Sequence, residues 1–123
     1  ISIDSDHPRY EDVVLAFFPH GLGHFLGIQV HDKGGRPEQS DLHSNLRLTR
    51  TLEKDNVITV EPGLYFIPAL LDRLRLPATK ACVNWGLVDQ LLPFGGIRIE
   101  DNLIITESGA DNVTRNAFDG VAD

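Results

Sequence analysis

The feature that most restricts the fold of this chain is the stretch of residues 18–32, which holds three histidines and three glycines. Glycine lowers helix stability by about 1 kcal/mol relative to alanine, so Gly21 and Gly23 make a regular helix unfavourable there. Glycine also lets backbone approach an ion or ligand closely, and histidine is the commonest metal ligand in proteins. The stretch therefore predicts a site and argues against a regular helix.

The three histidines of this stretch are not equivalent as metal ligands. His20 and His24 have the i, i+4 spacing of two ligands on one helix face, but the intervening glycines argue against a helix. Four residues of strand span roughly 13 Å, which is several times a metal–ligand bond. We expect one of this pair to bind metal and the other to support that ligand or contact the substrate. His31 is a further candidate for the same pocket.

Two glutamates downstream are candidate ligands at expected strand ends. Glu61 ends the apolar run of residues 57–60 and precedes a Pro-Gly turn. Glu100 lies in an alternating segment, where strand geometry would place Arg98 on the same face. Taken singly, Glu61 could be a turn residue, and Arg98 with Glu100 could be an exposed surface pair. One histidine and two carboxylates together would suit Mn, Fe, Co or Zn.

Periodicity and turn residues predict a chain of mixed α and β structure. The expected elements are a helix over residues 10–17, extended segments over 25–31 and 46–52, a loop over 33–45, strands over 57–61, 64–67, 97–100 and 102–106, short helices within 68–93, and an irregular tail from residue 109. The strands over 97–100 and 102–106 could also be one strand interrupted at residues 101–102.

Composition excludes several classes of function. A net charge of −7 argues against binding to a phosphate backbone, and no apolar run approaches the length of a membrane span. The single cysteine, Cys82, excludes an internal disulfide and fits a reducing, cytoplasmic setting. Because the chain has no methionine and begins at Ile1, we expect further sequence upstream.

Three blocks of the sequence resemble, in order, the catalytic domain of the pita-bread metallopeptidases, which include methionine aminopeptidase, aminopeptidase P, creatinase and prolidase. These blocks are residues 17–32, 60–65 and 94–101. Residues 46–50, 66–68 and 84–85 also resemble the bacterial Xaa-Pro dipeptidase (prolidase) branch of this family. The resemblance implies an α+β fold that is part of a pita-bread, creatinase/aminopeptidase-like structure, with a curved antiparallel sheet and covering helices.

The same resemblance implies a ligand set for two divalent metal ions. We expect Mn, and the same ligands could also bind Co, Fe or Zn. The family uses two aspartates, one histidine and two glutamates, and His24, Glu61 and Glu100 match the last three. No aspartate of this chain matches the first two, so ligands of the second site are missing. We therefore expect residues 1–123 to be the C-terminal portion of the catalytic domain, with an N-terminal domain and the first half of the catalytic domain absent.

The resemblance also implies roles in catalysis and substrate binding. Glu61 would carry a proton, and His20 and His31 would steady the substrate carbonyl, with His31 also contacting the substrate. Arg47 would bind the terminal carboxylate of the substrate, and Arg98 would be a second substrate-binding residue.

The function implied is metal-dependent hydrolysis of Xaa-Pro dipeptides by a water activated by two metal ions. The isolated chain would be inactive. Its partners would be the dipeptide substrate and the remaining half of the enzyme, and neither nucleic acid nor membrane would be a partner. The full-length enzyme would be a homodimer in the cytoplasm. Three alternatives stay open. They are an aminopeptidase P that cleaves longer peptides, a relative that hydrolyses phosphotriesters, and a non-catalytic domain that binds peptide or protein.

Overall fold

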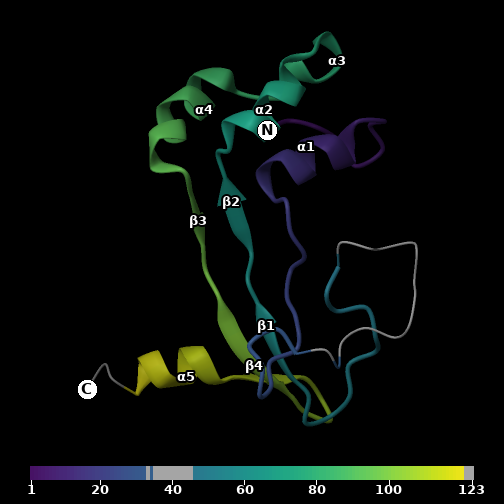
Figure 1. Ribbon diagram of the computed structural model, residues 1–123, viewed down its shortest axis with the longest axis vertical. Helices are drawn as coiled ribbons and strands as arrows, with labels where there is room; N and C mark the ends of the chain where they lie inside the picture. The colour runs from purple at the N-terminus through teal and green to yellow at the C-terminus, as the bar shows by residue number, and fades with distance from the viewer. Residues whose placement is uncertain (33, 35–45, 121–123) are drawn as a thin grey trace. The chain divides into compact units, whose positions relative to one another are not determined.

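The computed structural model describes residues 1–32, 34 and 46–120. The chain forms two compact units (Figure 1). Unit 1 comprises Ile1–Pro19 and Gly63–Arg98, and unit 2 comprises His20–Pro62 and Ile99–Asp123. Both units combine short helices with antiparallel strands, so the predicted α+β class is confirmed. The loop predicted over residues 33–45 lies, except for Gly34, outside the described residues.

Unit 1 holds short helices and a two-stranded antiparallel ladder. Its elements are α1 (Tyr10–Phe17), β2 (Gly63–Tyr65), α2 (Pro68–Leu71), the 3-10 helix η3 (Asp72–Arg75), α3 (Pro77–Lys80), α4 (Trp85–Leu91), the 3-10 helix η4 (Leu92–Phe94) and β3 (Gly96–Arg98). Prolines begin α2 and α3, where the missing N–H breaks no helical hydrogen bond. The Asn84 side chain accepts a hydrogen bond from the Leu87 N–H and so caps α4.

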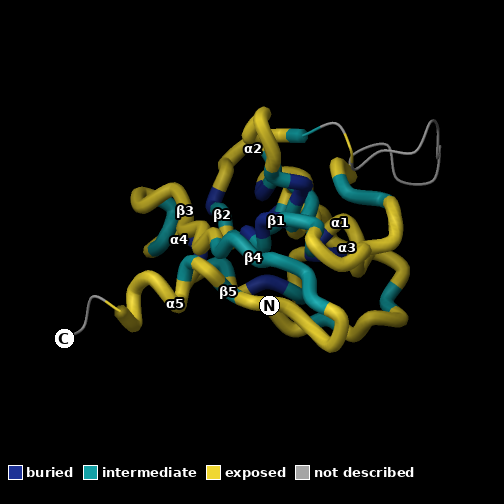
Figure 2. The backbone as a smooth tube through the Cα atoms, turned by 90° about the horizontal axis from the view of Figure 1, so that it is seen from below, coloured by how far each residue is buried: buried dark blue, intermediate teal, exposed yellow. Residues whose placement is uncertain are grey.

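The core of unit 1 forms where α1 packs against the segments that follow β2. Val13, Ala16 and Phe17 are buried on one face of α1, at the spacing of an amphipathic helix. Figure 2 marks the buried, half-buried and exposed segments along the backbone. The rings of Phe17 and Phe66 meet edge to face, with 6.0 Å between their centroids. The other buried members of this cluster are Leu71, Leu74, Val83 and Val88. All of these residues are apolar, so the core supplies packing rather than chemistry.

The sheet of unit 2 is built on β1 (Val57–Val60), which has a neighbour on each side. On one side it pairs antiparallel with β4 (Asp101–Ile105), and β4 pairs with β5 (Ala110–Asn112), which leads into α5 (Val113–Asp119). On the other side, residues 22–26 run antiparallel to β1 through backbone hydrogen bonds. These are Leu26 N–H to Val57 O at 2.9 Å, Thr59 N–H to His24 O at 2.9 Å, and Glu61 N–H to Leu22 O at 2.7 Å.

Several predicted elements are confirmed with shifted bounds. The helix over residues 10–17 is α1, and the strands over 57–61 and 64–67 are β1 and β2. The strands over 97–100 and 102–106 are β3 and β4, which belong to different sheets, and the break falls at residues 99–100. The connection over 68–93 forms more helical segments than the one or two predicted.

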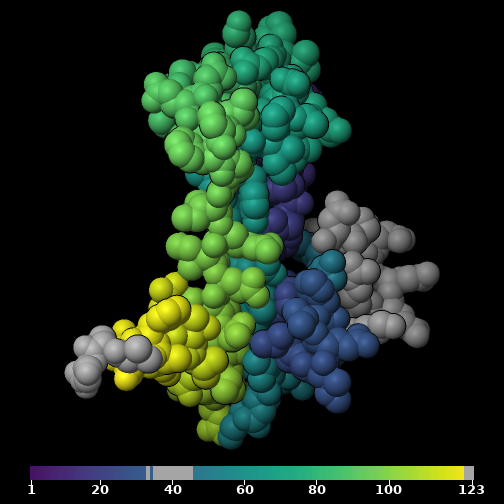
Figure 3. Space-filling view, turned by 60° about the vertical axis from the view of Figure 1, so that its left-hand side comes forward, coloured from purple at the N-terminus to yellow at the C-terminus, as the bar shows by residue number. Residues whose placement is uncertain are grey.

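Three predictions of local structure were wrong. Residues 46–52 form no strand, and in the segment 25–31 only Phe25 makes a β-bridge, to Ile58. The tail is not irregular, because β5 and α5 form there, and α5 lies on the surface of unit 2 (Figure 3, yellow). Among the described residues, no helix is both long and apolar enough to span a membrane.

Asp101, at the start of β4, holds α5 in place. Its Oδ2 accepts hydrogen bonds from Arg115 Nε and Asn112 Nδ2, each at 2.9 Å. The Asn112 side chain also accepts from the Arg115 N–H and caps α5. Thr114 contributes a further contact, since its Oγ1 accepts from the Asn102 N–H at 2.9 Å. This set of side chains fixes the helix to the strand that directly follows Glu100.

We expect unit 2 to lose stability in acid through Asp101. The hydrogen bonds from Arg115 and Asn112 hold the pKa of Asp101 below its ordinary value of 3.8. Because the pKa is lower in the folded state, ionised Asp101 adds to the free energy of unfolding. This stabilisation is complete above about pH 5 and is lost as the pH falls through 3.8 towards the folded-state pKa. In acid titrations followed by circular dichroism, Asp101→Asn should therefore unfold less steeply below pH 5 than wild type. The control Asp111→Asn, on exposed β5, should follow wild type; an Asp101→Asn profile identical to wild type would refute the prediction.

Candidate metal centre

His24 and Glu61 form a buried polar pair in unit 2. His24 is 3% exposed and Glu61 is 8% exposed. The Nε2 atom of His24 lies 3.3 Å from Oε1 of Glu61. Burying a polar group costs free energy unless the group is paired with another polar group or with a ligand. A buried contact between a histidine and a glutamate therefore indicates a functional site.

The hydrogen bonds of His24 determine which ring nitrogen faces Glu61. Nδ1 lies 2.9 Å from the backbone oxygen of Phe25. Because a carbonyl oxygen only accepts hydrogen bonds, Nδ1 must carry a proton and donate it there. In the neutral ring this leaves the lone pair on Nε2, the atom that faces Glu61. Metal-binding histidines are commonly oriented by such a bond from the other ring nitrogen.

Gly23 sets the distance between the histidine segment and β1. A Cβ atom on Gly23 would lie 2.0 Å from the backbone oxygen of Thr59, so only glycine fits without a shift of backbone. This close approach lets the His24 N–H donate to Thr59 Oγ1 at 3.0 Å, while the Thr59 N–H donates to His24 O. The sequence places glycine beside histidine here because the backbone of β1 must come this near.

The donors of this pair fit a divalent metal ion in type and in spacing. Imidazole nitrogen and carboxylate oxygen bind such ions at about 2.0–2.2 Å, which puts two donors of one ion roughly 3–3.5 Å apart. The observed 3.3 Å between His24 Nε2 and Glu61 Oε1 falls in that interval. Among the described residues, however, no group of three or more His, Cys, Asp or Glu side chains is placed to hold a metal. The chain thus presents two donors that fit, without a complete ligand set.

The strand register brings the backbone of Glu100, the third predicted ligand, to the same part of unit 2. Val60 pairs with Asp101, and the Ile99 N–H donates to Pro62 O at 3.2 Å. This register places Glu100 opposite Glu61, where residues of antiparallel strands share one face. The residue is exposed, and its carboxylate completes no three-ligand group with His24 and Glu61.

The other predicted site residues differ in whether they lie near the His24–Glu61 pair. The exposed His31 packs its ring against His24, with 4.4 Å between centroids. His20 is half-buried, and its Nδ1 lies 2.8 Å from Gly21 O. Arg47 is exposed in unit 2, whereas Arg98 ends β3 and belongs to unit 1. The structure therefore brings His31 to the His24–Glu61 pair and leaves the substrate roles of the two arginines as predictions.

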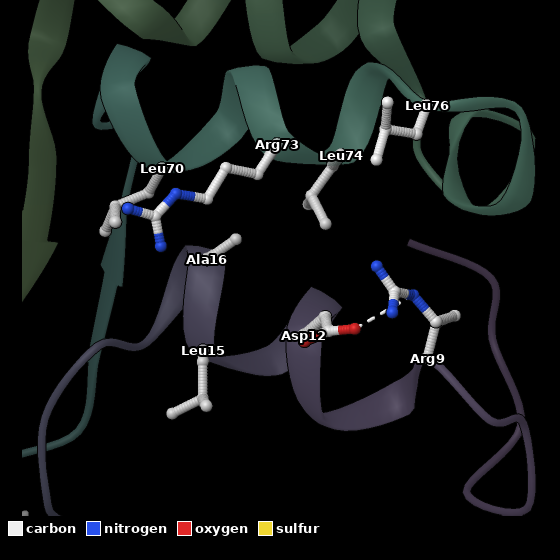
Figure 4. Close-up of a pocket in the computed structure, with 8 residues that line it drawn as sticks. All are labelled: Arg9, Asp12, Leu15, Ala16, Leu70, Arg73, Leu74 and Leu76. Carbon is white, nitrogen blue, oxygen red and sulfur yellow. Dashed lines mark ion pairs between the residues drawn. The ribbon is translucent and has the colours of Figure 1, made fainter.

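A pocket of about 240 Å³ lies in unit 1, between α1 and the α2–η3 segment (Figure 4). Leu15, Ala16, Leu70 and Leu74 are among its lining residues, together with the Arg9–Asp12 ion pair at 2.9 Å. It is smaller than most ligand pockets, which enclose roughly 300–1,000 Å³. None of the predicted site residues lines it.

Thr59 is a site residue that sequence reasoning missed. It is 1% exposed, and its side chain contacts both His24 and Glu61. The available signal was a hydroxyl residue within an apolar strand, two positions before the candidate glutamate and therefore on the same face. Threonine is also common in ordinary strands, so this signal is weak without the structure.

Comparison with known proteins assigns the chain to a family. The sequence model of metallopeptidase family M24 matches residues 7–107, which is most of the chain. The chain belongs to metallopeptidase family M24. The M24 chain is 51% identical over 126 residues to a Xaa-Pro dipeptidase of Xanthomonas campestris pv. campestris (strain B100), and 55% identical over 106 residues to one of Marinobacter nauticus. These matches cover 96% and 85% of the M24 chain, but it spans only 29% and 25% of those relatives.

Solved structures of aminopeptidases are similar to the M24 chain. Zn-substituted Escherichia coli aminopeptidase P in complex with product matches with a TM-score of 0.55 at 34% identity, and a Pseudomonas aeruginosa aminopeptidase with 0.59 at 28%. Each match covers 94% of the M24 chain and 21% of the solved chain. The predicted fold is confirmed: the M24 chain is part of a pita-bread structure. The predicted relationship to Xaa-Pro dipeptidases is confirmed as well.

Proposed function

We propose that these 123 residues are the C-terminal portion of the catalytic domain of an enzyme that hydrolyses Xaa-Pro dipeptides. The observation that carries the proposal is the buried His24–Glu61 pair, with Nε2 of the histidine 3.3 Å from the carboxylate. About half of the residues are identical to those of proteins named Xaa-Pro dipeptidase, which supports this substrate class. The lone Cys82 is consistent with a cytoplasmic, reducing setting.

The metal-binding residues in this proposal are His24, Glu61 and Glu100. His24 Nε2 and Glu61 Oε1 would bind one divalent ion, and Glu100, opposite Glu61 in the register, would contribute to both sites. We propose Mn²⁺, although the same donors accept Co, Fe and Zn. The remaining ligands would come from protein outside these 123 residues. When bound, the ions lower the pKa of a water molecule and polarise the scissile carbonyl.

The side chains around the pair would handle protons and substrate. Glu61 would accept a proton from the attacking water and deliver it to the leaving proline nitrogen. His31 and His20 would donate hydrogen bonds to the substrate carbonyl oxygen as negative charge develops on it. Arg47 would pair with the terminal carboxylate of a dipeptide, since a guanidinium matches a carboxylate with two parallel hydrogen bonds. Arg98 would be a second contact to substrate.

Aminopeptidase P activity is the second candidate. Its supporting observation is the match to the Escherichia coli enzyme, at 34% identity over 94% of the chain. The two activities differ in the group that their substrates carry after proline. A dipeptide presents a charged carboxylate there, and a longer peptide presents a neutral amide, which would leave a carboxylate-binding arginine without its partner.

The test compares Leu-Pro with Leu-Pro-Gly as substrates of the full-length gene product that contains this chain, supplemented with Mn²⁺. We expect wild type to prefer Leu-Pro. Arg47→Leu should lower that preference, measured as the ratio of kcat/KM values, by about 10–100-fold, because a charge-assisted hydrogen-bond pair is lost.

Two control variants make the comparison specific. Glu100→Ala should be inactive on both peptides, and Arg73→Leu, an exposed arginine of unit 1, should keep the wild-type ratio. A preference that is unchanged in Arg47→Leu would remove Arg47 from substrate recognition. A wild type that cleaves only Leu-Pro-Gly would establish aminopeptidase P activity instead. Lack of activity on both peptides with metal bound would favour a binding domain or another substrate class.

A further inference from the structure

Thr59 occupies the most enclosed position of β1, between the two donors of the candidate metal centre. It is 1% exposed, and its strand neighbours Ile58 and Val60 are apolar. A valine would fill the same volume without the cost of burying a hydroxyl. A buried hydroxyl at this position therefore needs hydrogen-bond partners that offset the cost of its desolvation.

The contacts around Oγ1 limit its proton to two partners. Oγ1 accepts from the His24 N–H at 3.0 Å. Two acceptors lie 3.4 Å from Oγ1, the backbone oxygen of His24 and Oε1 of Glu61. The His24 oxygen already receives the Thr59 N–H at 2.9 Å. Glu61 is the more favourable partner for the hydroxyl proton, because its ionised carboxylate carries negative charge and accepts stronger hydrogen bonds than a carbonyl oxygen that already has a donor.

We propose that Thr59 is a positioning residue for metal binding: its hydroxyl links the backbone of His24 to the carboxylate of Glu61 and fixes that carboxylate against His24 Nε2. The inference rests on the proposed metallopeptidase function. Thr59 binds neither ion nor substrate. Its contribution is to hold the two metal donors 3.3 Å apart before the ion binds. Binding then costs less conformational entropy, because the two side chains are already in place.

The test measures Mn²⁺ affinity without substrate, by calorimetry on the full-length gene product. Thr59→Val keeps the shape and removes the hydroxyl, so the apparent Kd for Mn²⁺ should rise about 10–100-fold. Thr59→Ser restores the hydroxyl and should stay within about threefold of wild type. Thr79→Val is the matched control, because Thr79 is also 1% exposed and donates to Leu74 O at 2.8 Å, but lies in unit 1. Its Mn²⁺ affinity should not change.

Each outcome decides the proposal. Equal Mn²⁺ affinity of wild type and Thr59→Val overturns it, as does an equal loss in Thr59→Ser, which would assign the effect to packing. A wild type that binds Mn²⁺ but does not cleave Leu-Pro would refute the proposed substrate and leave this comparison readable, whereas a wild type that binds no Mn²⁺ overturns both. If Thr59→Val does not fold, a crystal structure of the Mn²⁺-loaded wild type decides. A distance from Thr59 Oγ1 to the Glu61 carboxylate of about 3.5 Å or less supports the proposal, and a longer distance overturns it.

Discussion

Replacing Glu61 with glutamine is expected to lower kcat for Leu-Pro hydrolysis by about 10²–10⁴-fold. Glutamine has nearly the same volume, so the buried site keeps its shape. Its neutral amide, however, cannot take up a proton from water and is a weaker metal donor than a carboxylate. Steady-state kinetics at saturating Mn²⁺, with the full-length gene product, measure the effect. Saturating Mn²⁺ keeps the metal sites filled, so the fall in kcat reports loss of proton transfer and not loss of metal.

The matched control for this variant is Glu107→Gln. The Glu107 side chain is 80% exposed and pairs with Lys54 at 2.9 Å, an arrangement that contributes little energy at a surface. Its kcat should equal that of wild type. If Glu61→Gln retained wild-type kcat, Glu61 would have no part in catalysis, and its contact with His24 would be a structural pair only.

Replacing Gly23 with alanine is expected to destabilise the protein by about 3 kcal/mol, the upper end of the range for overpacked sites. The added Cβ would lie 2.0 Å from Thr59 O, which is backbone and cannot rotate away. Residues 22–26 would have to move off β1, and the hydrogen bonds around His24 would lengthen. The free energy of unfolding, obtained from urea titrations, measures the loss, and Mn²⁺ affinity should fall with it.

Gly109→Ala separates this steric effect from the general effect of a glycine substitution. A Cβ on Gly109 would meet nothing within 4 Å. The variant should unfold within about 0.5 kcal/mol of wild type. A Gly23→Ala protein as stable as Gly109→Ala would show that the histidine segment can move away from β1 without loss, contrary to the close packing of Gly23 on Thr59.

The elements that could be predicted from sequence are those whose apolar residues follow a single period between turn residues. The helix over 10–17 and the strand over 57–61 are of this kind, and both form. The tail was missed although part of its signal is local, because the Asn112 side chain caps α5 through the N–H of Arg115, three residues further on. The contact of Arg115 with Asp101 joins residues 14 positions apart, and local periodicity does not contain it.

The candidate site was accessible to sequence reasoning in its residue types but not in its contacts. His24 and Glu61 could be selected from their glycine and proline neighbours, and spacing left open which of His20 and His24 is the ligand. The structure puts His24 Nε2 beside Glu61, through the pairing of residues 22–26 with β1. That pairing is a tertiary feature, as is the hydroxyl contact of Thr59. The assignment of metal ligands stays a prediction.

The central place of β1 in unit 2 has a consequence for how such a site can change over evolutionary time. One edge of β1 aligns the histidine segment, its own end carries Glu61, and its other edge aligns the strand that Glu100 precedes. The positions of three residues separated by dozens of others are thus encoded by one short pattern of backbone pairing. Inserting a single residue into β1 would turn alternate side chains to the opposite face and separate all three at once. Substitutions at exposed positions leave this backbone pairing in place, whereas a change in the length of the four-residue strand does not.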